Sequence, residues 1–159
     1  MKFEEFKVGQ TFKAHIRIDK QEFEKYISFT RTKNILHEKP ELAANEGITG
    51  TLLPGRAILA RVEGEMTRLD VFSNNIMLLY GMDGDPKWNN RHTRFIGEVY
   101  VGDKLEIEYT VSDKKEGNYD EKYGILSIDI QIKQISNNND DDNDKLVIVS
   151  HRNLYRIKK

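Results

Sequence analysis

The hydrophobic period of this chain changes from helical to strand-like near residue 74, and that change most limits the folds open to it. Before it, residues 56–69 contain no proline and place one face of apolar side chains at Ile58, Leu59, Val62, Met66 and Leu69, which predicts a long helix. After it, residues 124–135 alternate polar and apolar side chains, as a half-buried strand does. A long helix followed by a run of antiparallel strands predicts an α+β fold, in which one sheet wraps around one central helix.

The segments around these two complete the pattern. Further strands are predicted at residues 11–18, 75–82, 93–100, 105–111 and 146–157. Asp19 and Glu22 have the spacing of a capping box, so a helix is expected to begin after Asp19 and to end near Arg31. A second, short helix is expected to begin at Pro40 and to be closed by Gly47. The long helix therefore stands between one N-terminal strand and the rest of the sheet.

Composition and charge restrict the classes of function. At 159 residues the chain is expected to form one domain, residues 1–159. Its net charge of −1 does not suggest a nucleic-acid binder. The absence of cysteine excludes disulfides, thiolate metal sites and a cysteine nucleophile. Residues 1–10 lack the apolar run of a signal peptide, and no apolar run is long enough to cross a bilayer, so we expect a cytoplasmic protein without a membrane partner.

Metal ions and redox cofactors are not expected. No histidine has a partner at the fixed spacing of a metal site, and no dinucleotide or flavin fingerprint is present. Residues 137–144 are rich in Asn and Asp, but they lack the central Gly and the terminal Glu of an EF-hand calcium loop. This run is interpreted as the tip of a hairpin.

Four short segments carry a resemblance to a known family. Residues 6–12 (FKVGQTF) match an opening F-x-V-G-x-x-F, and residues 94–103 (RFIGEVYVGD) are similar to a strand and turn R-F-x-x-P-V-x-x-G-D. Residues 34–43 (NILHEKPELA) match part of D-x-N-P-x-H-x-D-x-x-x-A, and residues 48–56 contain a Leu-Pro-Gly that leads into the long helix. In this order the segments resemble the MaoC-like (R)-specific enoyl-CoA hydratase and 3-hydroxyacyl dehydratase family. The resemblance covers most of the chain and implies a hotdog fold.

The resemblance also implies a reaction and a set of residues. In these hydratases an Asp and a His hold a water and move its protons while it adds across a trans-2-enoyl thioester; the dehydratases run the step backwards. A backbone N–H at the start of the central helix stabilises the negative charge that forms on the thioester oxygen. Carried over, His37 takes the place of the catalytic His, Gly55 that of the oxyanion glycine, and Asn34 that of a supporting Asn.

The sequence departs from the family at the catalytic Asp, which should stand five residues before the His. Thr32 stands there instead, Ile35 replaces the family's Pro, and Lys39 replaces a second Asp. A hydroxyl orients water but exchanges no proton near neutrality, whereas general acid–base catalysis is worth about 10² to 10⁴ in rate. Three alternatives stay open. His37 works alone or with another carboxylate, of which Glu38 is nearest in sequence; the chain is the less active partner in a hetero-oligomer; or the pocket binds an acyl thioester without turning it over.

Further expectations follow from the resemblance. The ligand is an acyl thioester of coenzyme A or of a phosphopantetheine carrier, with no other cofactor, and Lys33 and Arg56 are candidates to bind its phosphates. The chain is expected to pair as a homodimer or with another hotdog subunit, with the acyl pocket at or near the interface. Acyl-CoA thioesterase activity is a weaker alternative, because Glu63 and Glu65 lie well past the N-terminus of the central helix.

Overall fold

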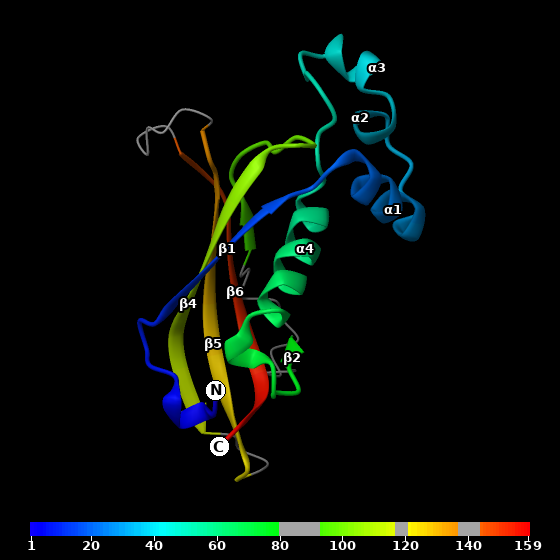
Figure 1. Ribbon diagram of the computed structural model, residues 1–159. Helices are drawn as coiled ribbons and strands as arrows, with labels where there is room; N and C mark the ends of the chain where they lie inside the picture. The colour runs from blue at the N-terminus through cyan, green and yellow to red at the C-terminus, as the bar shows by residue number, and fades with distance from the viewer. Residues whose placement is uncertain (80–92, 117–120, 137–143) are drawn as a thin grey trace, which may run out of the picture.

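The computed structural model describes residues 1–79, 93–116, 121–136 and 144–159 (Figure 1). Their strands form one antiparallel sheet in the order β1-β4-β5-β6-β2, and β3 also pairs with β6. The strands are β1 (Thr11–Arg17), β2 (Leu78–Leu79), β3 (Thr93–Phe95), β4 (Lys104–Glu116), β5 (Tyr123–Gln134) and β6 (Lys145–Lys158).

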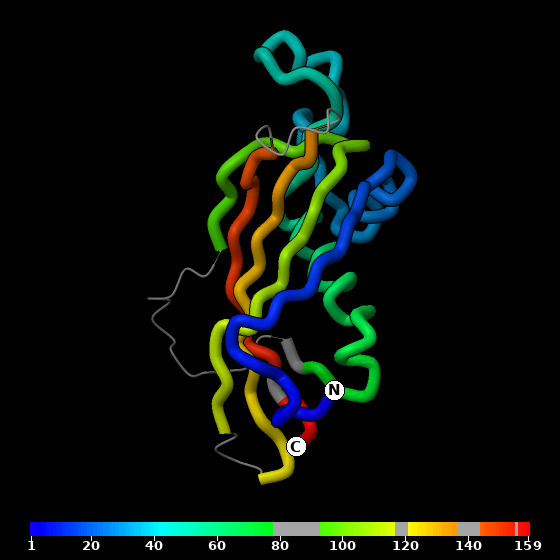
Figure 2. The backbone as a smooth tube through the Cα atoms, turned by 60° about the vertical axis from the view of Figure 1, so that its left-hand side comes forward, coloured from blue at the N-terminus to red at the C-terminus, as the bar shows by residue number. Residues whose placement is uncertain are grey.

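One long helix covers one face of this curved sheet, and three shorter helices project as an arm beyond the end of β1 (Figures 1 and 2). The long helix is α4 (Gly55–Thr67). The arm consists of α1 (Lys20–Thr30), α2 (Ile35–Glu38) and α3 (Pro40–Ala44). Two single 3₁₀ turns, η1 (Phe3–Glu5) and η2 (Asp70–Phe72), lie at the end of the sheet that is remote from the arm (Figure 1).

The hydrophobic core lies between α4 and the sheet. Alternate residues of β4 and β5 point into it, as the period of two requires; they are Leu105, Ile107, Tyr109, Val111, Leu126, Ile128, Ile130 and Ile132. The Tyr109 hydroxyl donates a hydrogen bond to the Val62 carbonyl of α4 at 2.7 Å. Burial raises the pKa of Tyr109, so this hydroxyl keeps its proton and holds the helix to the sheet.

A second connection joins α4 to β6 through charged side chains. Arg152 Nε donates to Glu63 Oε1 at 2.7 Å, and the two side chains are only 10% and 13% exposed. Arg152 also donates to the Ser150 hydroxyl at 2.7 Å. Burying two charges costs free energy that their mutual attraction offsets only when both are present. The pair therefore fixes the position of the helix along the sheet.

The fold class and most predicted elements are confirmed. The sheet packs around one central helix, as the change of hydrophobic period predicts. The capping box is present: Asp19 Oδ1 accepts from the Glu22 N–H at 2.8 Å, and Glu22 Oε2 accepts from the Asp19 N–H at 3.1 Å. Helix α1 ends before Arg31, whose φ of 55° is left-handed, and Gly47 has a φ of 85° just after α3. Both segments end where the sequence predicts.

The prediction of a strand over residues 93–100 is wrong beyond Phe95. The N–H groups of Ile96 and Gly97 both donate to the Val147 carbonyl, at 2.7 and 3.2 Å, and two donors on one acceptor interrupt the ladder. Of the strand predicted at 75–82, the structure shows β2, and residues 80–82 lie outside the described residues. Of the hairpin tip predicted at 137–144, residues 137–143 also lie outside them. None of the described helices is long and apolar enough to span a membrane.

Candidate active site

Helix α2 holds His37, and Asn34 determines where that helix begins. Asn34 Oδ1 accepts a hydrogen bond from the Leu36 N–H at 3.0 Å, which is the bond of a helix N-cap. The Asn34 carbonyl accepts from the His37 N–H at 3.0 Å. Sequence reasoning missed this four-residue helix, although it assigned Asn34 a supporting role. In the structure Asn34 supports the site by orienting the turn that carries His37.

The ring of His37 is fixed from two sides. Its Nδ1 lies 2.8 Å from the carbonyl oxygen of Leu52. Because a carbonyl oxygen only accepts, Nδ1 carries the hydrogen in this contact, and the neutral ring has its lone pair on Nε2. The ring also meets Phe23 of α1 edge to face, with centroids 6.3 Å apart and planes at 79°. His37 is therefore oriented as a group that accepts a proton at Nε2.

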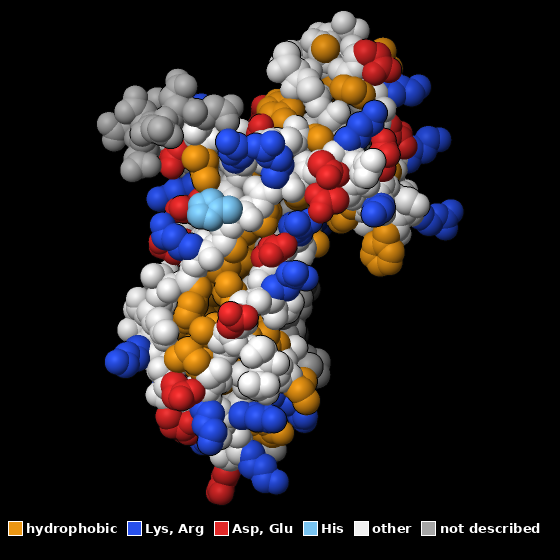
Figure 3. Space-filling view, viewed as in Figure 1, with side chains coloured by type: hydrophobic (Ala, Val, Ile, Leu, Met, Phe, Trp, Pro, Cys, Tyr) orange, Lys and Arg blue, Asp and Glu red, His pale blue; other side chains and the backbone are white. Residues whose placement is uncertain are grey.

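His37 lines a cleft of about 760 Å³ between α1 and the segment that follows it. One face of α1 forms one wall, with residues at helical spacing: Lys20, Phe23, Glu24, Ile27 and Ser28. The remaining lining residues are His37, Glu38, Lys39, Pro40 and Thr51. The cleft thus contains one histidine, two carboxylates, two ammonium groups and two hydroxyls. Figure 3 shows how densely charged side chains cover this arm.

Thr32, at the position where the resemblance implies a catalytic Asp, is not among the residues that line this cleft. Its hydroxyl lies 2.7 Å from the Thr30 hydroxyl, which donates to the Tyr26 carbonyl at 2.9 Å. The Thr30 proton is engaged in that bond, so Thr32 is the donor between the two threonines. The Thr32 hydroxyl therefore donates its hydrogen bond to the last residue of α1.

Gly55 is the first residue of α4 and follows its N-cap, Pro54. It lies three residues after Leu52, the partner of His37, so their Cα atoms are at most about 10 Å apart. The ring of Phe95 lies directly over this glycine: a Cβ built on Gly55 would be 2.2 Å from Phe95 Cε1. With the ring in this position there is room only for a glycine, and any larger residue requires Phe95 to move. Packing under the Phe95 ring therefore explains a glycine at position 55 without any catalytic role, beside the catalytic role that the resemblance implies.

The structure does not bring Lys33 and Arg56 into the cleft. Both side chains are exposed, and neither lines it. The ammonium groups at the cleft belong to Lys20 and Lys39 instead. Sequence reasoning also missed Glu24, which stands on the same face of α1 as Phe23 and Ile27. The helical spacing of these residues was the available signal.

An ion-pair network joins α1 to α4. Arg61 of α4 donates to Glu22 Oε1 at 2.6 Å and to Glu65 Oε1 at 2.9 Å. The hydrogen bond from Arg61 lowers the pKa of Glu22, and the hydrogen bond to Glu22 raises the pKa of Arg61. This network places the wall of the cleft relative to the central helix. Within the described residues, no group of three or more His, Asp or Glu side chains is arranged to hold a metal ion.

A long helix lying on a curved antiparallel sheet is the hotdog fold, and solved structures with this fold match nearly the whole chain. A MaoC-domain dehydratase from Chloroflexus aurantiacus has a TM-score of 0.76 at 22% identity, over 100% of this chain and 41% of that chain. An (R)-hydratase from A. caviae involved in PHA biosynthesis has a TM-score of 0.69 at 17% identity, over 97% and 98%.

A third match comes from a protein complex. The HadBC (3R)-hydroxyacyl-ACP dehydratase of Mycobacterium tuberculosis has a TM-score of 0.65 at 14% identity, over 93% of this chain and 96% of that chain. No protein-family model matches the sequence, and no curated protein matches it. The chain thus has the hotdog fold that MaoC-like dehydratases and (R)-hydratases share, at identities that establish the fold alone.

Proposed function

We propose that this protein is an acyl-thioester hydratase or dehydratase, which adds water reversibly across trans-2-enoyl thioesters. The observation that carries the proposal is the orientation of His37. The Leu52 carbonyl fixes its Nδ1 at 2.8 Å, which leaves Nε2 as the nitrogen with the lone pair, and His37 lines the cleft together with Thr51. The hotdog fold, shared with an (R)-hydratase and with dehydratases, supports the same reaction.

The proposed hydration moves two protons. His37 Nε2 accepts a proton from water while the water oxygen forms a bond to C3 of the enoyl group. The electrons of the C2=C3 double bond shift toward C1, and the thioester oxygen gains negative charge. The backbone N–H of Gly55 and the positive end of the α4 dipole stabilise that charge. A second group, protonated beforehand, delivers its proton to C2 and is left as the conjugate base. The proton taken up by His37 then returns to that group through solvent, which restores both for the next turnover, and dehydration runs these steps in reverse.

We assign to Glu24 the delivery of the second proton, the one that goes to C2. Neighbouring residues on a helix do not face one another, so Glu38 does not share a direction with the adjacent His37. Glu24 lines the cleft from the opposite wall, on α1, and its nearest cation is Lys20 at 3.9 Å. In the motif that the sequence resembles, the carboxylate comes from an Asp five residues before the His. In this proposal Glu24 of α1 supplies it instead.

A non-catalytic thioester-binding or partner subunit is the second candidate. The observation that favours it is the Thr32 hydroxyl, which is bonded to Thr30 and does not line the cleft. One matching structure is itself a complex, HadBC. Acyl-CoA thioesterase activity is less well supported, since Glu63 of the central helix is held by Arg152 and is only 13% exposed.

Pairing with a second hotdog subunit is part of the proposal. Strand β3 pairs only with β6 among the described strands, and Phe95 and Ile96 at this edge are 52% and 57% exposed. An unpaired strand edge with apolar side chains is suited to pairing with another chain. Light scattering after size-exclusion chromatography should give at least twice the mass of 18.5 kDa. A stable monomer would contradict pairing with itself.

Hydration of crotonyl-CoA by the purified chain tests the proposed reaction, followed as loss of the enoyl absorbance. We expect His37→Ala and Glu24→Gln each to lower kcat by about 10² to 10⁴, the usual contribution of an acid–base group. Glu38→Gln is the matched control, with the same change of charge in the same cleft, and should stay within about tenfold of the native rate. An inactive native chain that gains activity as Thr32→Asp would favour the binding or partner subunit.

A further inference from the structure

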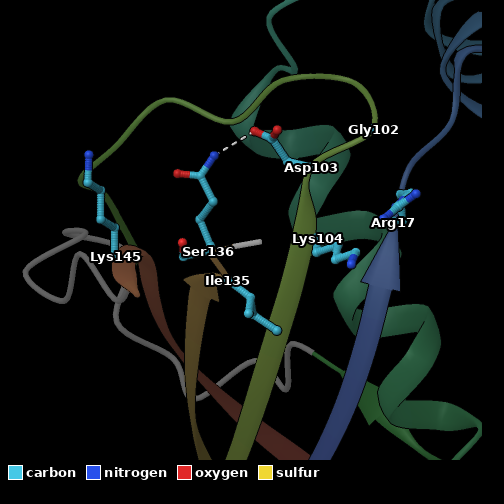
Figure 4. Close-up of a pocket in the computed structure, with 8 residues that line it drawn as sticks. Arg17, Gly102, Asp103, Lys104, Ile135, Ser136 and Lys145 are labelled. Atoms are coloured by element: carbon cyan, nitrogen blue, oxygen red, sulfur yellow. Dashed lines mark hydrogen bonds between the residues drawn. The ribbon is translucent and has the colours of Figure 1, made fainter. Parts of the chain in front are cut away.

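A second cleft lies at the end of the sheet where β1 and β5 finish and β4 and β6 begin (Figure 4). Its volume is about 560 Å³, and three cations line it: Arg17, Lys104 and Lys145. Figure 4 shows Arg17 and Lys104 on one side and Lys145 on the other, with Asp103 and Ser136 between them.

Asp103, the single carboxylate among the residues that line this cleft, already accepts hydrogen bonds within the protein. Asp103 Oδ2 accepts from the Tyr100 N–H at 2.8 Å and from Gln134 Nε2 at 2.7 Å. These bonds close the turn in which Gly102 has a φ of 90°. The carboxylate thus holds the turn and forms no ion pair with the cations beside it. Among the described residues that line the cleft, three positive charges face one hydrogen-bonded negative charge, an excess of about two positive charges at neutral pH. Asp144 lies next to this lining, where its Oδ1 accepts a hydrogen bond from the Ser136 N–H at 3.0 Å.

The three cations also lack partners elsewhere in the described part of the chain. None of them lies within ion-pair distance of a described carboxylate. Other basic residues of the sheet, of α4 and of the C-terminus do form such pairs, namely Lys13, Arg61, Lys115, Arg152 and Lys159. Unpaired cations gathered around a concave surface form a binding site for a multiply charged anion.

The cationic cleft adjoins the His37 cleft through a hydrogen-bonded connection. The Gly102 N–H, at the cationic cleft, donates to the Ile18 carbonyl at 2.9 Å. The preceding residue, Val101, donates to the carbonyl of Thr51 at 2.9 Å, and Thr51 lines the His37 cleft. Arg17 lines one cleft and Lys20 lines the other, three residues apart and so at most about 10 Å between Cα atoms.

From these observations we infer that the cationic cleft binds the phosphate groups of the molecule that carries the acyl thioester. The inference rests on the proposed function for the identity of that molecule. A thioester whose reacting carbons lie in the His37 cleft would extend its carrier across the Thr51–Val101 connection, and its phosphates would meet Arg17, Lys104 and Lys145. The phosphates belong either to the nucleotide of coenzyme A or to a phosphopantetheine arm. This assignment moves phosphate binding away from Lys33 and Arg56.

Direct binding is the first test, by titration calorimetry with two probes that carry no acyl group. Adenosine 3′,5′-bisphosphate represents the nucleotide of coenzyme A, and 4′-phosphopantetheine represents the carrier arm. The test variant is Arg17→Ala with Lys104→Ala; the control is Lys7→Ala with Lys158→Ala, the same charge change at the other end of the sheet. We expect the test variant to bind at least one probe about tenfold more weakly or worse, and the control to stay within about twofold. Equal losses in both variants, or no binding of either probe by the native chain, would overturn the inference.

Kinetics separate this inference from the proposed function. Crotonyl-CoA is compared with crotonyl-N-acetylcysteamine, which has the same reacting group and no phosphate. The test variant should raise KM for crotonyl-CoA about tenfold and leave KM for the shorter thioester unchanged. Raised KM for both, or for neither, would contradict phosphate binding at this cleft. Inactivity of the native chain toward both thioesters would refute the proposed reaction, while the calorimetric result would still decide whether the cleft binds phosphate.

Discussion

Replacing Gly55 with alanine separates the two reasons for a glycine at the start of α4. A Cβ there would lie 2.2 Å from Phe95 Cε1, and ordinary contact begins at 3.4 Å, so the ring must move by about 1.2 Å (3.4 − 2.2). Overfilling a packed site costs about 1–3 kcal/mol. Because Phe95 is 52% exposed and can turn toward solvent, we expect the lower end of this range, about 1 kcal/mol in urea unfolding. In a Phe95→Ala background the same substitution should cost almost nothing.

Activity gives the second readout of this substitution. If the Gly55 N–H stabilises the thioester oxygen, a methyl group beside it hinders close approach, and kcat/KM should fall about 10² to 10³ in both backgrounds. A doubly substituted chain, Gly55→Ala with Phe95→Ala, that is stable and fully active would refute the catalytic role and leave only packing. An unfolding cost that persists after Phe95→Ala would refute the packing explanation.

Three further predictions concern stability. Tyr109→Phe removes a buried hydrogen bond to α4 and should lower the free energy of unfolding by about 1 kcal/mol in urea; an unchanged midpoint would argue against the bond. Glu63→Leu or Arg152→Met alone should each cost about 3–5 kcal/mol, whereas Glu63→Leu with Arg152→Met should recover most of the loss; additive costs in this double-mutant cycle would contradict the pair. Glu22 has a lowered pKa in the folded state, so the unfolded state binds its proton more tightly. Its contribution, about 0.2–1 kcal/mol for a partly exposed pair, should be complete above the ordinary pKa of 4.5 and disappear as pH falls below it. Arg61→Ala should weaken this dependence and leave the part that comes from the Asp19 N–H.

Local features were the most predictable from the sequence. The capping box at Asp19 and the end of α1 depend only on residues within one or two turns, and both are where the pattern puts them. The alternation in β5 gave its buried face correctly. The strand expected over 93–100 failed because the Val147 carbonyl, about fifty residues away, takes two N–H donors at Ile96 and Gly97. A period-two pattern contains no information about such a shared acceptor.

Contacts between distant segments could not be predicted either, because local patterns do not show which remote residues meet. The sequence singled out Gly55, but nothing in it placed the Phe95 ring over that residue, forty positions later. Sequence proximity favoured Glu38 as the carboxylate beside His37, whereas the structure adds Glu24 from the opposite wall. Likewise, Lys33 and Arg56 were chosen for nearness to the motif along the chain. The cations that gather at a cleft come from three different strands, which only the tertiary structure brings together.

The way in which His37 is held argues for proton transfer over simple binding. Holding an acyl chain requires an apolar surface and places no demand on which imidazole nitrogen carries the hydrogen. Here the Asn34 cap orients the helix of His37, and the Leu52 carbonyl selects the tautomer with a basic Nε2. An orienting acceptor at Nδ1 is what a histidine general base uses in hydrolytic triads. Thr32, where the resemblance implies an Asp, takes part in neither of these contacts. The open chemical question is therefore the second proton, and Glu24→Gln addresses it directly.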